Sequence, residues 1–166
     1  VLAQMLLEDV TGRSFADLAE EYIFQPLGMR RTTFASPLPE RYHANVAAGH
    51  DHAGKMHPGG WLICPGEAAG AIFTTAADYA QFMIATRDAF LGRKGALLRR
   101  DLAQQMLMRQ GAGQFGLGWR SVGDGPTRRM NHGGSNDGYQ SETNLYLDSG
   151  DGAAVFTNAV AGIVLE

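Results

Sequence analysis

A polar, glycine-rich segment, His132-Gly133-Gly134-Ser135-Asn136-Asp137-Gly138-Tyr139, holds the residue types in this chain that are best suited to chemistry. Two adjacent glycines leave room for a ligand against the backbone, whose N–H groups can then face a developing negative charge. A histidine at the head of the segment can donate a hydrogen bond or positive charge to an acidic group. The residues alone leave open a second interpretation, a glycine-rich turn with a structural histidine.

A second group of candidate residues is the segment His50-Asp51-His52, with His57 shortly after it. Two histidines separated by one residue point the same way in a strand, and an aspartate can complete a zinc site. A zinc hydrolase of the metallo-β-lactamase kind would follow them with an Asp-His pair, where this chain has Gly54-Lys55. We therefore expect a solvated loop with scattered histidines, and the sequence predicts no metal and no other cofactor.

Composition excludes several classes of protein. The chain has 166 residues and a formal net charge of −3, which gives no basic surface for nucleic acid. No apolar run approaches the roughly 18 residues of a membrane span. Its one cysteine, Cys64, excludes internal disulfides, and we expect it to be a small buried residue, not a nucleophile. The sequence offers no indication of a cellular compartment.

Helical periodicity marks the first part of the chain. Apolar residues recur at helical spacing over 2–10, and Gly12 follows them in the position of a C-terminal cap. Ser14 and Asp17 form a capping-box pattern for a second helix, which we expect Pro26-Leu27-Gly28 to end.

The middle of the chain is less regular at first and then helical again. Residues 35–70 lack periodicity, which is typical of a segment that lines a site or is mobile. Thr75 and Asp78 form another capping box for a helix that ends before Gly92. A short helix over 101–110 should follow, and we expect its residues Leu102 and Met106 to point inward.

The last part of the chain has the alternation of strands. Strands are predicted over 115–119, 127–132 and 139–147, and the turn residues 149–152 should join the last of these to a strand over 153–157. Helices followed by an antiparallel sheet predict an α+β fold in which helices flank the sheet. The expected organisation is helices over 1–34, a long loop region over 35–70, helices over 71–111 and antiparallel strands over 112–160.

The segment His132–Gly134, followed by Gly138–Ser141, resembles the third motif of the serine β-lactamase and penicillin-binding protein family, K-T-G or H-x-G. The likeness is to the branch that holds class C β-lactamases, esterases and D-amino-acid peptidases. Further segments resemble that branch in family order, namely 24–34, 68–78, 115–119 and 155–158. The resemblance implies a β-lactamase/transpeptidase-like fold.

The same resemblance implies roles for individual residues. His132 would help to bind substrate and tune the catalytic hydrogen bonds, and Ser135 would lend its backbone N–H as one of two oxyanion donors. Gly133-Gly134 would keep the strand open to the bound acyl group. Asn136 and Tyr139 would line the substrate pocket.

Two motifs of that family are missing from the 166 residues: no serine is followed three places on by lysine, and no Y-x-N occurs. We therefore expect residues 1–166 to be the C-terminal part of a serine hydrolase whose nucleophile lies upstream, and to be inactive alone. Leu165-Glu166 matches a dipeptide often left at a cloning junction.

Three further expectations concern substrate and partners. At pH 7 a histidine anchors a carboxylate less strongly than a lysine, which favours a small-molecule or peptide ester or amide over a β-lactam. A piece that exposes apolar surface should also self-associate. The alternatives are a non-catalytic binding module with the same fold and, less favoured, a metalloprotein built on the histidine loop.

Overall fold

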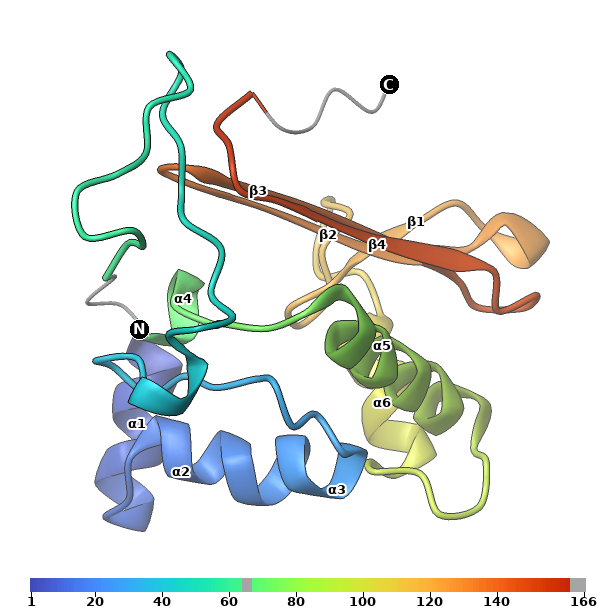
Figure 1. Ribbon diagram of the computed structural model, residues 1–166. Helices are drawn as coiled ribbons and strands as arrows, with labels where there is room; N and C mark the ends of the chain where they lie inside the picture. The colour runs from blue at the N-terminus through green and yellow to red at the C-terminus, as the bar shows by residue number, and fades with distance from the viewer. Residues whose placement is uncertain (64–66, 162–166) are drawn as a thin grey trace.

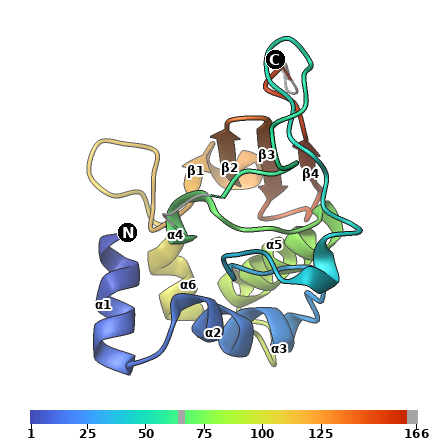
Figure 2. The same ribbon diagram turned by 60° about the vertical axis from the view of Figure 1, so that its left-hand side comes forward.

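The computed structural model describes residues 1–63 and 67–161 and has the predicted α+β architecture. An antiparallel sheet lies over the helices α5 (Ala76–Leu91) and α6 (Arg100–Leu107), as Figure 1 shows. The N-terminal helices form a further group beside α5 and α6 (Figures 1 and 2). In the described part of the chain, no helix is long and apolar enough to cross a bilayer.

The sheet holds the strands in sequence order, so every connection joins neighbours. Gly138 and Gly150 have φ angles of 82° and 84° in the turns after β2 and β3, a conformation that glycine adopts without strain. The predicted hairpin of β3 and β4 is thus present, and β2 and β3 form a further hairpin that was not predicted. The strands are β1 (Arg120–Val122), β2 (Arg129–Asn136), β3 (Tyr139–Tyr146) and β4 (Gly152–Thr157).

The strand predicted over 115–119 is wrong, because those residues form a turn that packs against the end of α6. The N–H of Gly116 donates to the carbonyl of Trp119 at 2.7 Å, and the N–H of Leu117 donates to that of Met106 at 2.8 Å. Gly118 has a φ of 91°, which leaves the extended region. The alternating glycines therefore serve close backbone approach in a turn, and β1 begins only at Arg120.

The N-terminal helices begin and end where their caps predict, with one exception. α1 (Leu2–Thr11) ends at Gly12, and the hydroxyl of Ser14 accepts the N–H of Asp17 at 3.1 Å to cap α2 (Phe15–Ala19). Pro26 does not end the second helix, because a π-helical turn over Glu20–Phe24 continues into α3 (Gln25–Leu27) with Pro26 in its first turn. A proline is tolerated there, and Gly28 provides the stop.

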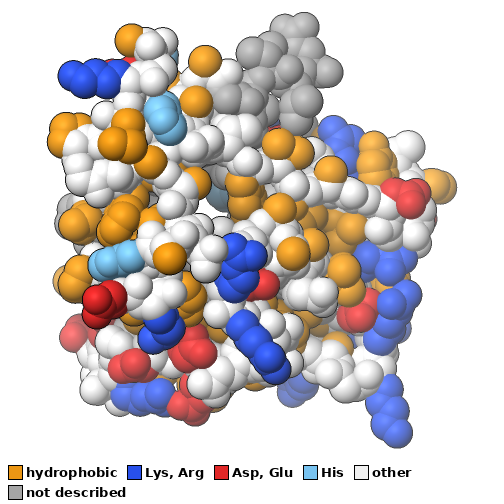
Figure 3. All heavy atoms as spheres, viewed as in Figure 1, with side chains coloured by type: hydrophobic (Ala, Val, Ile, Leu, Met, Phe, Trp, Pro, Cys, Tyr) orange, Lys and Arg blue, Asp and Glu red, His pale blue; other side chains and the backbone are white. Residues whose placement is uncertain are grey.

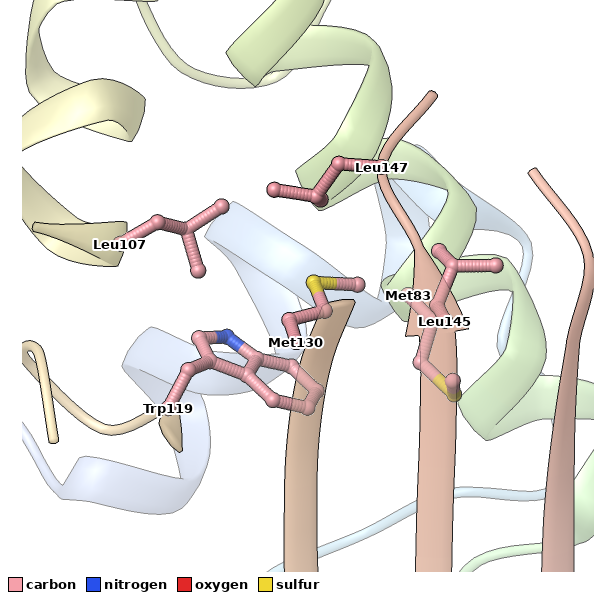
Figure 4. Close-up of a cluster of buried hydrophobic side chains, with 6 residues drawn as sticks. All are labelled: Met83, Leu107, Trp119, Met130, Leu145 and Leu147. Carbon is pink, nitrogen blue, oxygen red and sulfur yellow. The ribbon is translucent and has the colours of Figure 1, made fainter. Parts of the chain in front are cut away.

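The main core lies between the sheet and helices α5 and α6 (Figure 4). Leu102 is not inward as predicted but 40% exposed, whereas Ala103 and Leu107 are fully buried. The register of α6 is set by its packing, and Met106 meets the margin of the core. The buried cluster consists of Met83, Leu107, Trp119, Met130, Leu145 and Leu147.

The long segment predicted over 35–70 has little regular structure. It holds a 3₁₀ turn (Glu40–Tyr42), the short helix α4 (Glu67–Gly70) and an excursion that rises beside the end of the sheet in both ribbon views (Figures 1 and 2). The expectations for Cys64 and for Leu165-Glu166 lie outside the described residues.

Candidate active site

The candidate segment does not lie between strands, because β2 runs through it as far as Asn136. Residues 132–136 pair in register with 143–139 of β3. Successive side chains point to opposite faces of a strand, so His132, Gly134 and Asn136 share one face. The third motif is therefore a strand that presents alternate residues to one site.

A cavity of about 950 Å³ lies against this face of the sheet. His132, Gly134, Asn136 and Tyr139 line it from the sheet, while α2 and residues 68–75 line it from the other side. The structure thus brings four of the six candidate residues to one cavity. Aliphatic and aromatic side chains make up most of the remaining wall, which suits an apolar group better than a charged one.

His132 is held by a residue of the neighbouring strand β3 and by Trp119. Its carbonyl accepts the hydroxyl of Thr143 at 2.8 Å, and its imidazole meets the ring of Trp119 edge to face, with 6.4 Å between the ring centroids. Trp119 in turn stacks on Phe82, 6.0 Å away, which anchors it to α5. Thr143 and Trp119 were not predicted as site residues, although Thr143 alternates in phase with Tyr139 on β3.

The two glycines of the motif face opposite sides of the sheet. A Cβ at Gly134 would lie 2.6 Å from the hydroxyl oxygen of Ser141, a residue that also lines the cavity. A Cβ at Gly133 would lie 2.6 Å from a carboxylate oxygen of Glu142 on the opposite face. Gly134 therefore keeps the cavity face open, whereas Gly133 makes room for Glu142 behind the sheet.

The backbone N–H of Ser135 points away from β3. The N–H of Leu147 donates to the carbonyl of Arg128 at 2.9 Å, and this pattern repeats at every second residue of an antiparallel ladder. Even-numbered residues of β2 therefore bond to β3, and the N–H of Ser135 faces the side of β1. Because β1 pairs with β2 only from Arg129 to Asn131, no strand among the described residues covers Ser135 there.

Asn136 and Tyr139 connect the end of the hairpin to the long loop. The amide of Asn136 donates to the carbonyl of Gly70 at 2.8 Å, and the hydroxyl of Tyr139 donates to that of Ala47 at 2.8 Å. Burial raises the pKa of Tyr139, so this hydroxyl stays protonated and donating at neutral pH. Both side chains are therefore fixed in the cavity wall.

The histidine segment does not form a metal site in the described part of the chain, where no three His, Cys, Asp or Glu side chains are placed to hold an ion. The carboxylate of Asp51 instead accepts the N–H groups of Ala53 and Lys55, at 2.8 and 2.9 Å. His50 contacts the carbonyl of Asn158 through Nδ1 at 3.0 Å.

Comparison with known proteins identifies the family and the fold. The family model described as Beta-lactamase matches residues 1–164. The chain therefore belongs to the Beta-lactamase family, and its fold is of the β-lactamase/transpeptidase type. None of the curated proteins matches the sequence significantly.

Solved structures of the same fold include three informative neighbours. D-alanine carboxypeptidase AmpC from Burkholderia cenocepacia superposes with a TM-score of 0.77 at 18% identity, over 95% of this chain and 54% of its own. A D-stereospecific amidohydrolase from Streptomyces sp. gives 0.72 at 25% identity, over 98% and 49%. The octameric penicillin-binding protein homologue from Pyrococcus abyssi gives 0.75 at 21% identity, over 96% and 37%. The chain thus spans about half the length of such neighbours or less.

Proposed function

We propose that residues 1–166 are the C-terminal part of a serine hydrolase that acts through an acyl-enzyme. The observation that carries the proposal is one edge of β2, where the uncovered N–H of Ser135 lies beside the cavity lined by His132 and Gly134. A backbone N–H fixed in a strand can stabilise the oxyanion of a tetrahedral intermediate without reorganising. His132 provides a donor on the wall of the same cavity.

The serine nucleophile and its general base come from outside these residues in this proposal. Family membership and the absence of S-x-x-K from the 166 residues support it together. Positioned donors without a nucleophile form no acyl-enzyme. Residues 1–166 alone should therefore turn over neither a chromogenic cephalosporin nor a short-chain p-nitrophenyl ester, and turnover that His132→Ala abolishes would contradict this.

The substrate we favour is a neutral ester or amide, either a small molecule or a peptide. The largely apolar cavity wall supports this, as does histidine in place of the lysine that binds a carboxylate strongly. Several neighbours of the fold are described as D-amino-acid amidases or D-stereospecific amidohydrolases, which is consistent with amide cleavage.

The proposed oxyanion role belongs to the backbone N–H of Ser135 and not to its side chain, so two variants at this position can distinguish them. In the protein that carries residues 1–166 together with its nucleophile, Ser135→Pro removes the N–H and should lower kcat about 10²–10³-fold. Ser135→Ala keeps the N–H and should stay within about threefold of the parent. We would measure p-nitrophenyl ester hydrolysis and the rate of serine labelling by a fluorophosphonate.

Two controls make this experiment decisive. Gly133→Pro removes the other N–H on that edge of β2 and should cost less than Ser135→Pro, because Gly133 lies two residues nearer the end of β1 and is not the proposed oxyanion donor. Equal losses in Ser135→Ala and Ser135→Pro would contradict the backbone role. Absence of any labelled serine in that protein would instead favour the non-catalytic binding module.

We also propose that residues 1–166, when isolated, self-associate through exposed apolar surface. Leu2, Met5, Leu6 and Val10 lie at helical spacing on α1 and are all more than half exposed. Soluble proteins rarely leave so continuous an apolar stripe bare. Figure 3 shows hydrophobic side chains on the upper left of the face drawn and mainly charged side chains at its lower left, where α1 lies in the same view of Figure 1.

A further inference from the structure

The 49–60 hairpin is the part of the long loop that stands nearest the β2–β3 turn, and it contains three histidines that the proposed function leaves unused. Its base is closed by the N–H of Gly49, which donates to the carbonyl of Gly60 at 2.8 Å. The N–H of His57 donates to the carbonyl of Gly49 at 2.9 Å. The hairpin is therefore a defined structure, and it projects beyond the end of the sheet (Figures 1 and 2).

The imidazole of His57 occupies a slot between two glycines. A Cβ at Gly49 would lie 2.9 Å from its Cδ2 atom, and a Cβ at Gly138 would lie 2.6 Å from both Cδ2 and Nε2. Gly138 lies in the β2–β3 turn, two residues after Asn136, the last residue of β2. The slot therefore joins the hairpin to the strand end that carries the Ser135 N–H, and any larger residue at either glycine would displace the ring.

The polar end of this ring lies beside the carboxylate of Asp137. Nε2 of His57 is buried and lies 3.5 Å from a carboxylate oxygen of Asp137, and it has no hydrogen-bond partner among the described residues. At this distance and alignment, a neutral imidazole gains little from the carboxylate, whereas an imidazolium is attracted to it. The contact therefore depends on the proton that His57 carries.

The other ionisable groups around His57 have different surroundings. The hairpin contributes Asp51, whose pKa is lowered mainly by its bond from the Lys55 N–H and less by the positive charges of His57 and His52. The Asp51 carboxylate thus accepts its hydrogen bonds within its own turn. The remaining groups near His57 on these elements are His50, His52 and Lys55 of the hairpin and Tyr139 of β3.

We propose that His57 is a positioning residue whose imidazolium pairs with Asp137 and latches the 49–60 hairpin onto the β2–β3 turn. Histidine is the side chain whose charge changes most readily near neutral pH, so the latch tightens as the pH falls. The latch itself requires no catalysis. Its consequence, a more rigid Ser135 N–H at lower pH, rests on the proposed function.

The expected effect is modest because the latch is one of several attachments. Asp137 is 67% exposed, so solvent and salt screen the pair. The base of the hairpin is also held by bonds that do not depend on pH, from the His50 N–H to the Asn158 carbonyl at 3.0 Å and from the Asn158 amide to the Ala48 carbonyl at 2.8 Å. We therefore expect local loosening of the hairpin, not its detachment.

Hydrogen exchange on ¹⁵N-labelled protein at pH 6 and pH 8 tests the latch. After correction for the intrinsic pH dependence of exchange, the amides of Gly49, His57 and Gly60 should be protected about two- to fivefold more strongly at pH 6. Asp137→Asn and His57→Gln should each make protection equal at the two pH values. The matched control is His52→Gln, which removes an exposed histidine of the same hairpin and should keep the pH dependence.

Either of two results would overturn the proposal: a pH dependence that survives in Asp137→Asn, or one that disappears in His52→Gln. Leu145 and Leu147 amides, in the core, report whether a variant is folded. If His57→Gln unfolds, Asp137→Asn decides the question, because its side chain is largely exposed. The experiment needs neither nucleophile nor substrate, so the latch can fail while the hydrolase proposal stands, and the reverse.

Discussion

At the candidate site, some residues contribute a side-chain position and Ser135 contributes a backbone N–H. The geometry of an antiparallel strand explains this difference. His132, Gly134 and Asn136 reach the cavity with their side-chain positions, whereas Ser135 offers only its N–H at the strand edge. A shift of β2 by one residue would exchange these roles. The site therefore depends on the register between β2 and β3, which the two-residue turn at Asp137-Gly138 fixes.

Core packing at α6 yields a prediction at the same scale. Leu107 is fully buried in the main cluster and Leu102 is 40% exposed, although both are leucines of one helix. Leu107→Ala should lower the free energy of unfolding by about 2–5 kcal/mol, and Leu102→Ala by less than about 1 kcal/mol. Urea unfolding followed by tryptophan fluorescence measures both, and equal losses would contradict the register of α6.

At the scale of elements, the first turn of α5 is hydrogen-bonded both to its own cap and to residues 31 and 32 of an earlier segment. The hydroxyl of Thr75 accepts the N–H of Asp78 at 3.1 Å, as the capping pattern predicts. The carboxylate of Asp78 does not complete the box, however. It accepts the N–H of Arg31 at 2.7 Å and the hydroxyl of Thr32 at 2.9 Å.

This arrangement predicts an unequal cost for two aspartates of α5. Asp78→Ala leaves the backbone N–H of Arg31 without its acceptor and removes one of the two partners of the buried Thr32 hydroxyl, which should destabilise the fold by about 2–3 kcal/mol. Asp88→Ala removes only an ion pair with a half-exposed Arg93 and should cost about 0–1 kcal/mol. Thermal and urea unfolding of both variants would test this. A loss of stability in Asp78→Ala no larger than that in Asp88→Ala would refute the stabilising role of the Asp78 hydrogen bonds.

The elements also show what local sequence can and cannot predict here. The caps at Ser14 and Thr75 and the β3–β4 hairpin follow from interactions within a few residues, so pattern alone locates them. The turn at 115–119 depends on contact with the distant end of α6, and no alternation pattern records that contact. The site was found through its motif, but the partners of Asn136 and Tyr139 lie in an aperiodic segment and required the folded structure.

At the scale of the whole molecule, the exposed apolar stripe on α1 bears on the state of the isolated chain. The chain spans 54% or less of the length of the three neighbours compared above. The described residues still contain a buried core between the sheet and helices α5 and α6. We therefore expect the isolated chain to fold around that core and to bury the α1 stripe by association.

Replacement of the α1 stripe tests this expectation. Leu2 is 84% exposed and Leu6 is 64% exposed, so Leu2→Ser with Leu6→Ser removes apolar surface from a helix face with no buried residue. The double variant should sediment as a monomer at concentrations where the unchanged chain forms larger species, with little change in the urea midpoint. Met108→Ser, at a position 54% exposed outside α1, is the matched control and should leave association intact. A parent chain that is monomeric at about 100 μM, or an equal response to Met108→Ser, would contradict association through α1, because an apolar stripe drives assembly only where it is buried against a partner.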